Sequence, residues 1–436
     1  MLTSQRVVSS LPADTRKIFI AYSGGKDSHV LLDLLSSIAE IKPKITAVHV
    51  NHGLQAKADD WAMHCQTIAL NHGVAFQCIK VNAHKHKRQS LEEIARNARY
   101  QAFCTLLAEN DVLLLAQHRE DQMETLLLQL FRGAGVQGLA AMPVSSTLGK
   151  GRMIRPLLDV SQASINEYAI KHNLHWVEDP SNKDNDFDRN FLRNQILPQL
   201  KQRWPALDKT VSRSARHCAN SYLLNESLAK KLFENIYYKD DGSLNIQQLL
   251  ELTDKEQHLL IRYWFDTLQL RMPSEKTIIK IIEEVVKAKQ SANPLLKTKS
   301  YCIRRYRNKL FCFKTDPLDL AEPERYWDKK SNRLDLKGSI LSVCDASEGI
   351  SKAKWNNSEV WIKFRSGSEK IKLSGRQGHH SLKKLFQEQE IPPWERALIP
   401  LIYLNGNLAA VADLWISADY ISDAKNGCVQ FNWFKK

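Results

Sequence analysis

Short apolar runs alternate with amphipathic stretches in the first half of the chain. The runs at 18–21, 45–50, 74–81 and 112–116 are rich in Val, Ile and Leu and too short for typical helices, so they predict buried strands. Between them, an apolar stripe that begins at Val30 predicts a helix capped by Ser28, and Ser90 with Glu93 forms a capping box for another helix. Strands separated by helices predict a parallel sheet with right-handed crossovers, which binds ligands at the carboxyl ends of its strands.

The pattern changes in the second half of the chain. Stretches 252–268 and 273–288 have helical periodicity, and Pro273 with Ser274 opens the second of them. From Tyr301 onward, short alternating runs predict strands, with a hairpin turn at Asn405-Gly406 and one helix at 382–389. We therefore predict an α/β N-terminal domain with a parallel sheet at 1–215, a mainly helical module at 216–320, and a small, mostly-β α+β C-terminal domain at 350–436.

Composition adds a cationic surface to this picture. Lys and Arg exceed Asp and Glu by 62 to 48, a formal net charge of +14, which favours a polyanionic partner such as nucleic acid. A basic surface that only aids solubility would have the same charge. The eight cysteines include no Cys-x-x-Cys pair, which indicates reduced thiols. No uncharged apolar segment reaches the roughly 18 residues of a membrane helix, so we expect a cytoplasmic protein that spans no membrane.

The segment Ser23-Gly24-Gly25-Lys26-Asp27-Ser28 joins the first predicted strand to the first predicted helix. A turn at this place gathers unpaired backbone N–H groups at the positive end of a helix dipole, which makes an anion site. The glycines allow close approach, the two serine hydroxyls add donors, and Asp27 can hold the Mg²⁺ that accompanies phosphate. The spacing differs from that of a Walker A loop. The stretch predicts a pyrophosphate site, with a plain structural turn as the alternative.

The pattern Ser-Gly-Gly-x-Asp-Ser resembles the PP-loop of the ATP pyrophosphatase superfamily, whose members cleave ATP between the α and β phosphates. Further stretches resemble the tRNA(Ile)-lysidine synthetase family, namely those at 48–54, 95–100, 121–125, 132–139, 178–182, 189–200 and 382–403. The resemblance implies an adenine nucleotide α-hydrolase-like first domain that uses ATP and Mg²⁺. It also implies that free L-lysine and isoleucine tRNA with a CAU anticodon are the partners.

The resemblance further implies a reaction. AMP is transferred from ATP to the C2 oxygen of the wobble cytidine, and the ε-amine of lysine then displaces AMP to give lysidine, which changes codon specificity from AUG to AUA. One alternative is a PP-loop tRNA thiolase, against which the absence of paired cysteines argues. Others are a small-molecule amidating synthetase and a non-catalytic tRNA-binding protein with a relic nucleotide site. The sequence is also compatible with a homodimer.

Individual site residues follow from these motifs. Arg96 and Arg99 share a helix face, where they either reach phosphate or form a solvated basic surface. Asp121 and Glu124 stand at a helix start, where carboxylates suit the dipole and, by the resemblance, recognise lysine. His49, inside a strand, is interpreted as structural. The full assignments are catalytic Asp27, Arg96, Arg99 and Arg189; ATP-binding Ser23, Gly24, Gly25, Lys26, Asp27, Ser28, Val50 and His52; metal-binding Asp27; lysine-binding His118, Asp121 and Glu124; and tRNA-binding Arg132, Arg155, Arg193, Lys383 and Lys384.

Two positions depart from the family's usual pattern. Gln55 stands where arginine is common, so a cation is lost there. Glu120 stands where the family usually has the first of two adjacent aspartates, and the substitution keeps the charge.

Overall fold

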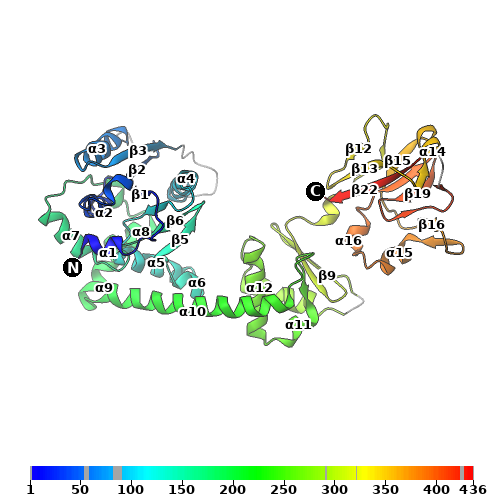
Figure 1. Cartoon of the computed structure of the whole chain (residues 1–436). Coiled ribbons are helices and arrows are strands. Elements are labelled where there is room, and N and C mark those ends of the chain that lie inside the picture. Colours follow the sequence, from blue (N-terminus) through cyan, green and yellow to red (C-terminus); the bar gives the residue numbers. More distant parts are fainter. Residues whose placement is uncertain are drawn as a thin grey trace. The chain divides into compact units, whose positions relative to one another are not determined.

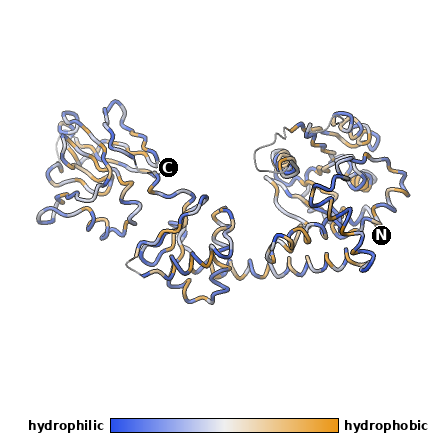
Figure 2. Tube along the Cα trace, turned by 180° about the vertical axis from the view of Figure 1, so that it is seen from behind, coloured by the Kyte–Doolittle hydropathy of each residue, from blue (hydrophilic) through white to orange (hydrophobic). Residues whose placement is uncertain are grey.

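The computed structural model describes residues 2–53, 58–81, 91–289, 292–320, 322–422 and 427–435. The chain divides into two units, Met1–Asn225 and Glu226–Lys436, each with hydrophobic cores of its own. In both units, hydrophobic and hydrophilic stretches alternate along the chain (Figure 2). Two predictions fall outside the described residues. These are the departure from the family pattern at Gln55 and the helix cap at Ser90.

A six-stranded sheet forms the centre of the N-terminal unit, in the order β3-β2-β1-β4-β6-β5. The predicted parallel strands are confirmed, but the run at 74–81 is not a buried strand, because β3 lies at the edge of the sheet and is largely exposed. One antiparallel edge strand, β5, is added because a two-residue connection to β6 permits only antiparallel pairing. The strands are β1 (Ile18–Ala21), β2 (Ile45–Asn51), β3 (Ala75–Lys80), β4 (Val112–Leu114), β5 (Ser145–Leu148) and β6 (Gly151–Ile154).

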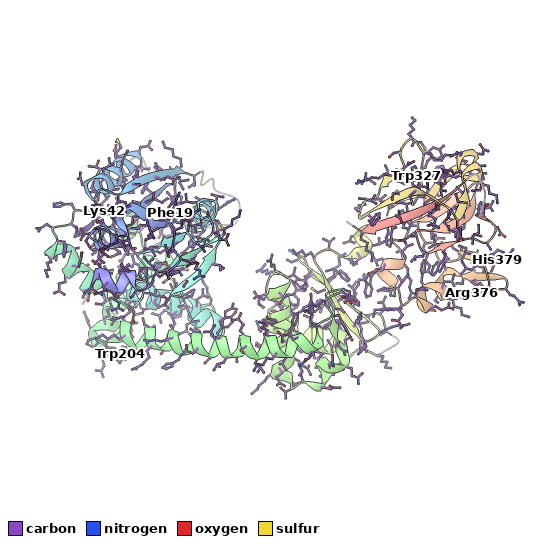
Figure 3. All side chains as sticks on the ribbon, in the orientation of Figure 1. Phe19, Lys42, Trp204, Trp327, Arg376 and His379 are labelled. Atoms are coloured by element: carbon purple, nitrogen blue, oxygen red, sulfur yellow. The ribbon has the colours of Figure 1, made fainter. Side chains whose placement is uncertain are left out.

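Helices cover both faces of this sheet (Figure 1). Ile18 and Ile20 of β1 pack in one core with residues of the helices at 26–36 and 162–171. Phe19, which Figure 3 labels, belongs to a different core with Phe103. The helices are α1 (Ser4–Val8), α2 (Lys26–Ser36), η1 (Lys42–Lys44), α3 (Ala58–Asn71), α4 (Leu91–Leu106), α5 (Arg119–Phe131), α6 (Val136–Leu139), α7 (Gln162–Lys171), η2 (Pro180–Lys183), α8 (Asp188–Phe191), the π-helix η3 (Leu192–Ile196), α9 (Leu197–Arg203) and α10 (Leu207–Ile236).

The C-terminal unit begins with helices packed on a four-stranded sheet of order β7-β10-β9-β8. The predicted helix after Pro273 is confirmed, since Ser274 caps α13 by accepting the Thr277 N–H. These elements are β7 (Leu244–Asn245), α11 (Ile246–Glu251), α12 (Asp254–Thr267), α13 (Glu275–Lys280), the π-helix η4 (Ile281–Val286), β8 (Leu295–Lys297), β9 (Cys302–Tyr306), β10 (Lys309–Phe313) and η5 (Pro317–Leu320).

The remaining residues form two five-stranded antiparallel sheets and a short hairpin, β16–β17. The predicted Asn405-Gly406 turn is confirmed between β18 and β19, with φ of 49° and 85° at its two residues. The elements are β11 (Arg325–Tyr326), β12 (Arg333–Asp335), β13 (Ser339–Ala346), β14 (Gly349–Ser351), α14 (Lys352–Asn357), β15 (Val360–Lys363), β16 (Lys370–Lys372), β17 (His379–Ser381), α15 (Leu382–Glu388), α16 (Pro393–Arg396), β18 (Leu401–Leu404), β19 (Asn407–Val411), β20 (Trp415–Ile416), β21 (Ile421–Ser422) and β22 (Cys428–Lys435).

No helix in the described part of the chain has the length and apolar character needed to cross a membrane.

Candidate active site

The glycine turn lies between the end of β1 and the start of α2. Gly24 has φ +82°, and a Cβ added to it would meet Cys65 Sγ at 2.9 Å, so both its backbone angle and its surroundings require glycine. Its carbonyl accepts the Val177 N–H at 3.0 Å. The turn therefore has a fixed shape before any ligand binds, and it presents the N-terminus of an 11-residue helix to the carboxyl end of the sheet.

Ser28 differs from its prediction as the cap of this helix. The cap is Gly25, and Ser28 is the third residue of α2. The Ser28 hydroxyl instead accepts the Ser23 N–H at 3.3 Å and donates to Gly25 O at 2.9 Å. The prediction was wrong because the hydroxyl bonds within the turn and both the cap and the helix start lie three residues earlier than predicted. Lys26 extends over the Trp176 ring, with its Nζ 5.5 Å from the ring centroid.

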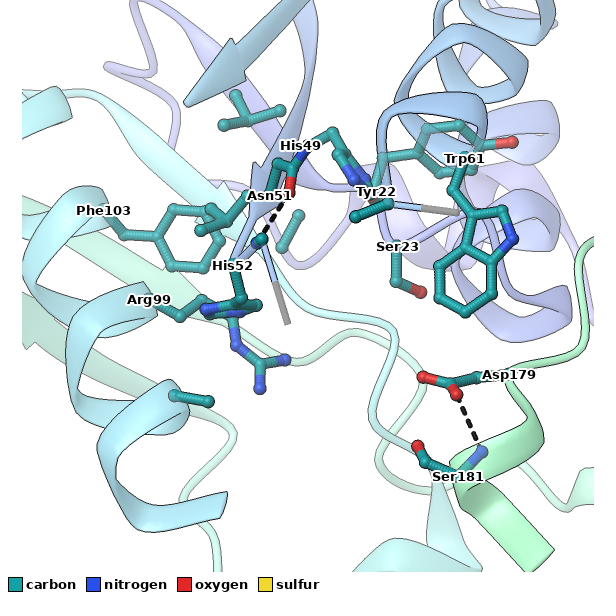
Figure 4. Close-up of a pocket in the computed structure, with 16 residues that line it drawn as sticks. Tyr22, Ser23, His49, Asn51, His52, Trp61, Arg99, Phe103, Asp179 and Ser181 are labelled. Carbon is teal, nitrogen blue, oxygen red and sulfur yellow. Dashed lines mark hydrogen bonds between the residues drawn. The ribbon is translucent and has the colours of Figure 1, made fainter. Parts of the chain in front are cut away.

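A cavity of about 330 Å³ opens beside the turn. Figure 4 shows Trp61 of α3 and Ser23 on one side of it, His52 and Arg99 on another, and Asp179 with Ser181 below. Val50 and His52, both predicted to bind ATP, line this cavity. Burial and then the charge of Arg99 lower the pKa of His52 to about 4, so its ring is neutral at pH 7. A wide, mixed polar and aromatic cavity next to an anion turn suits a nucleoside whose phosphates lie on the turn.

His49 and Arg155 are buried. The His49 ring has its Nδ1 3.0 Å from Tyr22 O, as its structural interpretation predicts. Arg155, predicted to bind tRNA, is only 4% exposed, and its guanidinium donates to Gln117 Oε1 at 2.5 Å and Pro143 O at 2.8 Å. The Arg155 guanidinium therefore fixes the end of β6 to neighbouring segments, and it has no free cationic surface for a phosphate.

A second cavity of about 220 Å³ gathers three of the four predicted catalytic side chains, all but Arg189. Asp27, Arg96, Arg99 and Asp121 all line it, together with Ser23 and Ser28 of the turn. Arg96 lies over the Tyr100 ring at 4.9 Å, which leaves it an exposed cation held by an aromatic face. Since Ser23 and Arg99 line both cavities, the nucleotide-shaped space continues directly into the one that holds the charged groups.

Two carboxylates and two guanidiniums form a tight cluster, of which Asp121 lines this cavity and which we call the quartet: Asp121, Glu124, Arg189 and Arg193. Arg189 Nε lies 2.7 Å from Glu124 Oε2, and Arg193 Nε lies 2.6 Å from Glu124 Oε1. Both arginines also donate to Asp121 Oδ1, at 2.9 and 3.0 Å. Sequence reasoning assigned the acids to lysine and the arginines to catalysis and tRNA, but the structure pairs them.

The quartet and His118 set one another's protonation. Burial by itself would raise the pKa of Asp121, but the charges of His118, Arg189 and Arg193 hold it below its usual range. Burial would lower the pKa of His118, but the carboxylates of Glu120, Asp121 and Asp27 raise it. His118 is also the N-cap of α5, and its backbone N–H donates a hydrogen bond to Asp121 Oδ2 at 3.0 Å. Asp121 therefore serves the helix start and the cluster together.

The predicted tRNA contacts remain distributed over the chain. Arg132, at the C-cap of α5, and Lys383 and Lys384, on α15, are exposed. Among the described residues, no group of three or more His, Cys, Asp or Glu side chains could hold a metal ion.

Sequence reasoning missed several lining residues. No motif in the sequence pointed to Trp61. Asp179 lies in the stretch 178–182, which resembles the family, but no role was assigned to it. The quartet did have a signal: acids at i and i+3 in one predicted helix and arginines at i and i+4 in another stretch are complementary in charge and spacing.

Comparison with known proteins agrees with this architecture. Residues 2–200 match a PP-loop domain, 244–311 a TilS substrate binding domain, and 360–433 a TilS substrate C-terminal domain. The tRNA(Ile)-lysidine synthase of Coxiella burnetii is 41% identical over 90% of this chain and 87% of its own. Those of Methylococcus capsulatus, at 37%, and Photobacterium profundum, at 39%, cover at least 95% of both chains. The predicted order of a PP-loop domain, helices and a β-rich C-terminal domain is confirmed, and the chain belongs to the tRNA(Ile)-lysidine synthase family.

Proposed function

We propose that this protein uses ATP to ligate free L-lysine to C2 of the wobble cytidine of isoleucine tRNA with a CAU anticodon. The observation that carries the proposal is the continuity of the two cavities at the carboxyl ends of β1, β2 and β4. One is shaped for a nucleoside and the other is lined by charged groups, and the anion turn borders both. This arrangement brings a nucleotide phosphate, a base and an amino acid to one place.

ATP binds with its adenosine in the first cavity and its phosphates on the turn. The N–H groups at the start of α2, with Arg96 and Arg99 across the cavity, face the phosphates and stabilise the charge that develops on them. Asp27 fits a Mg²⁺ ion because it is partly exposed, lines the second cavity and has an oxygen to which no described residue donates a hydrogen bond. When bound, Mg²⁺ neutralises phosphate charge.

The reaction has two displacements. The C2 oxygen of the cytidine attacks the α phosphorus, the bond to the β phosphate breaks, and pyrophosphate leaves. The neutral ε-amine of lysine then attacks C2, loses a proton and expels AMP, which leaves lysidine. The protein contributes mainly by positioning the three reactants. An unpaired anticodon base suits this chemistry because it can be splayed into a pocket.

The quartet suits the head group of an amino acid. Free lysine carries an α-ammonium and an α-carboxylate, and the quartet holds carboxylates and guanidiniums side by side, with Asp121 lining the second cavity. In this proposal Asp121 and Glu124 accept the ammonium, Arg189 and Arg193 bind the carboxylate, and His118 holds Asp121 in place. The ε-amine is then free to reach the adenylated base.

The exposed cations Arg132, Lys383 and Lys384 serve the tRNA in this proposal, as does Arg193 where it is solvent-accessible. We also propose domain limits of 1–215, 216–320 and 350–436 and the cytoplasm as the site of action. A homodimer is proposed as well, and light scattering would test it. Cys65, the cysteine beside the turn, is poorly suited to sulfur transfer, because burial raises the pKa of its thiol to about 12.

The test is transfer of labelled lysine to isoleucine tRNA in the presence of ATP and Mg²⁺. We expect ATP-dependent label on the CAU transcript and none on a transcript with another anticodon. Asp27→Ala should abolish transfer and leave tRNA binding intact, whereas Asp14→Ala, at an exposed position of the same unit, should leave both transfer and tRNA binding intact. No ATP-dependent label with the wild-type protein would refute the proposal.

A further inference from the structure

Gln162 is the first residue of α7, and its backbone is held firmly. Ser161 caps the helix by accepting the Ser164 N–H at 3.2 Å. The Gln162 N–H donates to Glu120 Oε2 at 2.9 Å. Glu120 is the residue that departs from the family pattern, and its carboxylate also lies 3.4 Å from Lys201 Nζ. The start of α7 is therefore tied to the start of α5, beside the charged cavity.

From this position the Gln162 side chain reaches the glycine turn. Its Nε2 donates to Asp27 Oδ1 at 2.9 Å, across 135 residues of sequence. A weaker contact, at 3.4 Å, runs from the same nitrogen to Asn166 Oδ1. The other Asp27 oxygen, Oδ2, receives no hydrogen bond from the described residues, and the His118 Nε2 lies 3.7 Å from it. One oxygen of the carboxylate is thus fixed by a hydrogen bond, and the other has the longer ion-pair contact with His118 and lies at the cavity that Asp27 lines.

The chemistry of the amide matters here. A lysine or arginine at position 162 would neutralise Asp27 and compete with a cation, and a carboxylate would repel it. A carboxamide fixes the rotamer of the aspartate without changing its charge. The Asp27 side chain is 35% exposed, and its contact with His118 is a longer ion pair of 3.7 Å, so the amide of Gln162 gives it the shorter, directional contact.

We propose that Gln162 is a positioning residue that holds Asp27 Oδ1 and thereby directs Oδ2 toward the Mg²⁺-bound phosphates of ATP. The inference rests on the proposed function, in which Asp27 binds the metal. Gln162 itself touches neither the substrate nor the reacting atoms. Its effect is on the concentration of Mg²⁺ at which ATP is bound.

The test compares Gln162→Met, which keeps the volume and removes the donor, with two reference variants. Asp27→Asn removes the metal ligand. Gln199→Met makes the same chemical change at an exposed residue of α9 that donates only to the carbonyl of Gln195. ATP binding is measured by calorimetry over a Mg²⁺ series without tRNA or lysine, so that the readout is independent of turnover, and unfolding temperatures are recorded for all variants.

We expect Gln162→Met to raise the half-saturating Mg²⁺ concentration roughly tenfold, the size expected for one hydrogen bond to a charged group, with ATP affinity restored at saturating Mg²⁺. Gln162→Ala should give the same shift and replaces Gln162→Met if that variant does not fold. A Mg²⁺ dependence equal to that of Gln199→Met, or a loss of affinity that Mg²⁺ does not restore, overturns the positioning role. If Asp27→Asn also leaves the Mg²⁺ dependence unchanged, the metal role of Asp27 fails as well.

Discussion

Glu124 is the most buried member of the quartet, and replacing it by glutamine tests whether the quartet exists in solution. Its side chain is 1% exposed, and its two oxygens accept three contacts of 2.6 to 2.8 Å from Arg189 and Arg193. Glu124→Gln keeps the shape of the side chain and removes its charge. Two guanidiniums then share the single carboxylate of Asp121, and one amide nitrogen faces cationic donors.

The magnitude follows from burial. Removing one partner of a buried ion pair costs about 3–5 kcal/mol, but Arg193 is 40% exposed and recovers part of its hydration, so we expect about 2–4 kcal/mol. For a unit of this size 1 kcal/mol corresponds to about 2–4 °C, which makes a 3 kcal/mol loss about 6–12 °C. An interaction confined to the surface would cost under about 1 kcal/mol.

The assay is urea unfolding of the full chain followed by circular dichroism, with Glu167→Gln, at an exposed position on α7, as the control. Combining Glu124→Gln with Arg193→Met completes a double-mutant cycle, in which we expect a coupling free energy above about 1 kcal/mol. A loss below about 0.5 kcal/mol with no coupling, against the 2–4 kcal/mol expected for a buried pair, would refute the quartet as a stabilising cluster.

Four further predictions concern single positions. Asp121→Asn should raise the KM for lysine at least about tenfold with the KM for ATP nearly unchanged, since a charged hydrogen-bond acceptor for the amino acid is lost; equal rises would contradict the assignment. Gly24→Ala should abolish ATP binding in calorimetry, because an alanine at φ +82° costs about 1–2 kcal/mol of backbone strain and its Cβ would meet Cys65 Sγ. The control is Gly133→Ala, where φ is +68° and a Cβ would meet open space, and this variant should bind ATP normally. Although burial alone raises the pKa of Glu120, His118, the Gln162 N–H and Lys201 lower it from 4.5 to about 2, so its contribution to stability is present above pH 4.5 and is lost as the pH falls toward 2. Glu120→Gln should therefore flatten acid unfolding in that range, and an unchanged slope would count against the contact. Trp394 is 1% exposed, and its ring centroid lies 5.2 Å from that of Phe311. Trp394→Ala should therefore lower the free energy of unfolding, measured by urea titration, by about 3–5 kcal/mol, and a loss under about 1 kcal/mol would show that this packing is absent.

The sequence alone determined the strands and the anion turn of the N-terminal unit. Runs such as Ile18–Ala21 are apolar at every position because both faces of the sheet are covered, and that pattern is visible without coordinates. Gly24 and Gly25 were equally visible, since the backbone angle of a turn restricts the residues that can occupy it. The order of the domains and the family followed from motifs spread along the chain.

Only the tertiary structure decided which side chains meet. Arg189 and Asp121 are 68 residues apart, and the Gln162 contact with Asp27 spans 135. Such pairs depend on how α5, α7 and α8 pack, which local periodicity does not specify. The same holds for Arg155: its sequence position suggested a free cation, and the fold buried its guanidinium among carbonyl and amide acceptors. Periodicity encodes which face of an element is buried, whereas the partners of a charged side chain are set by elements distant in sequence.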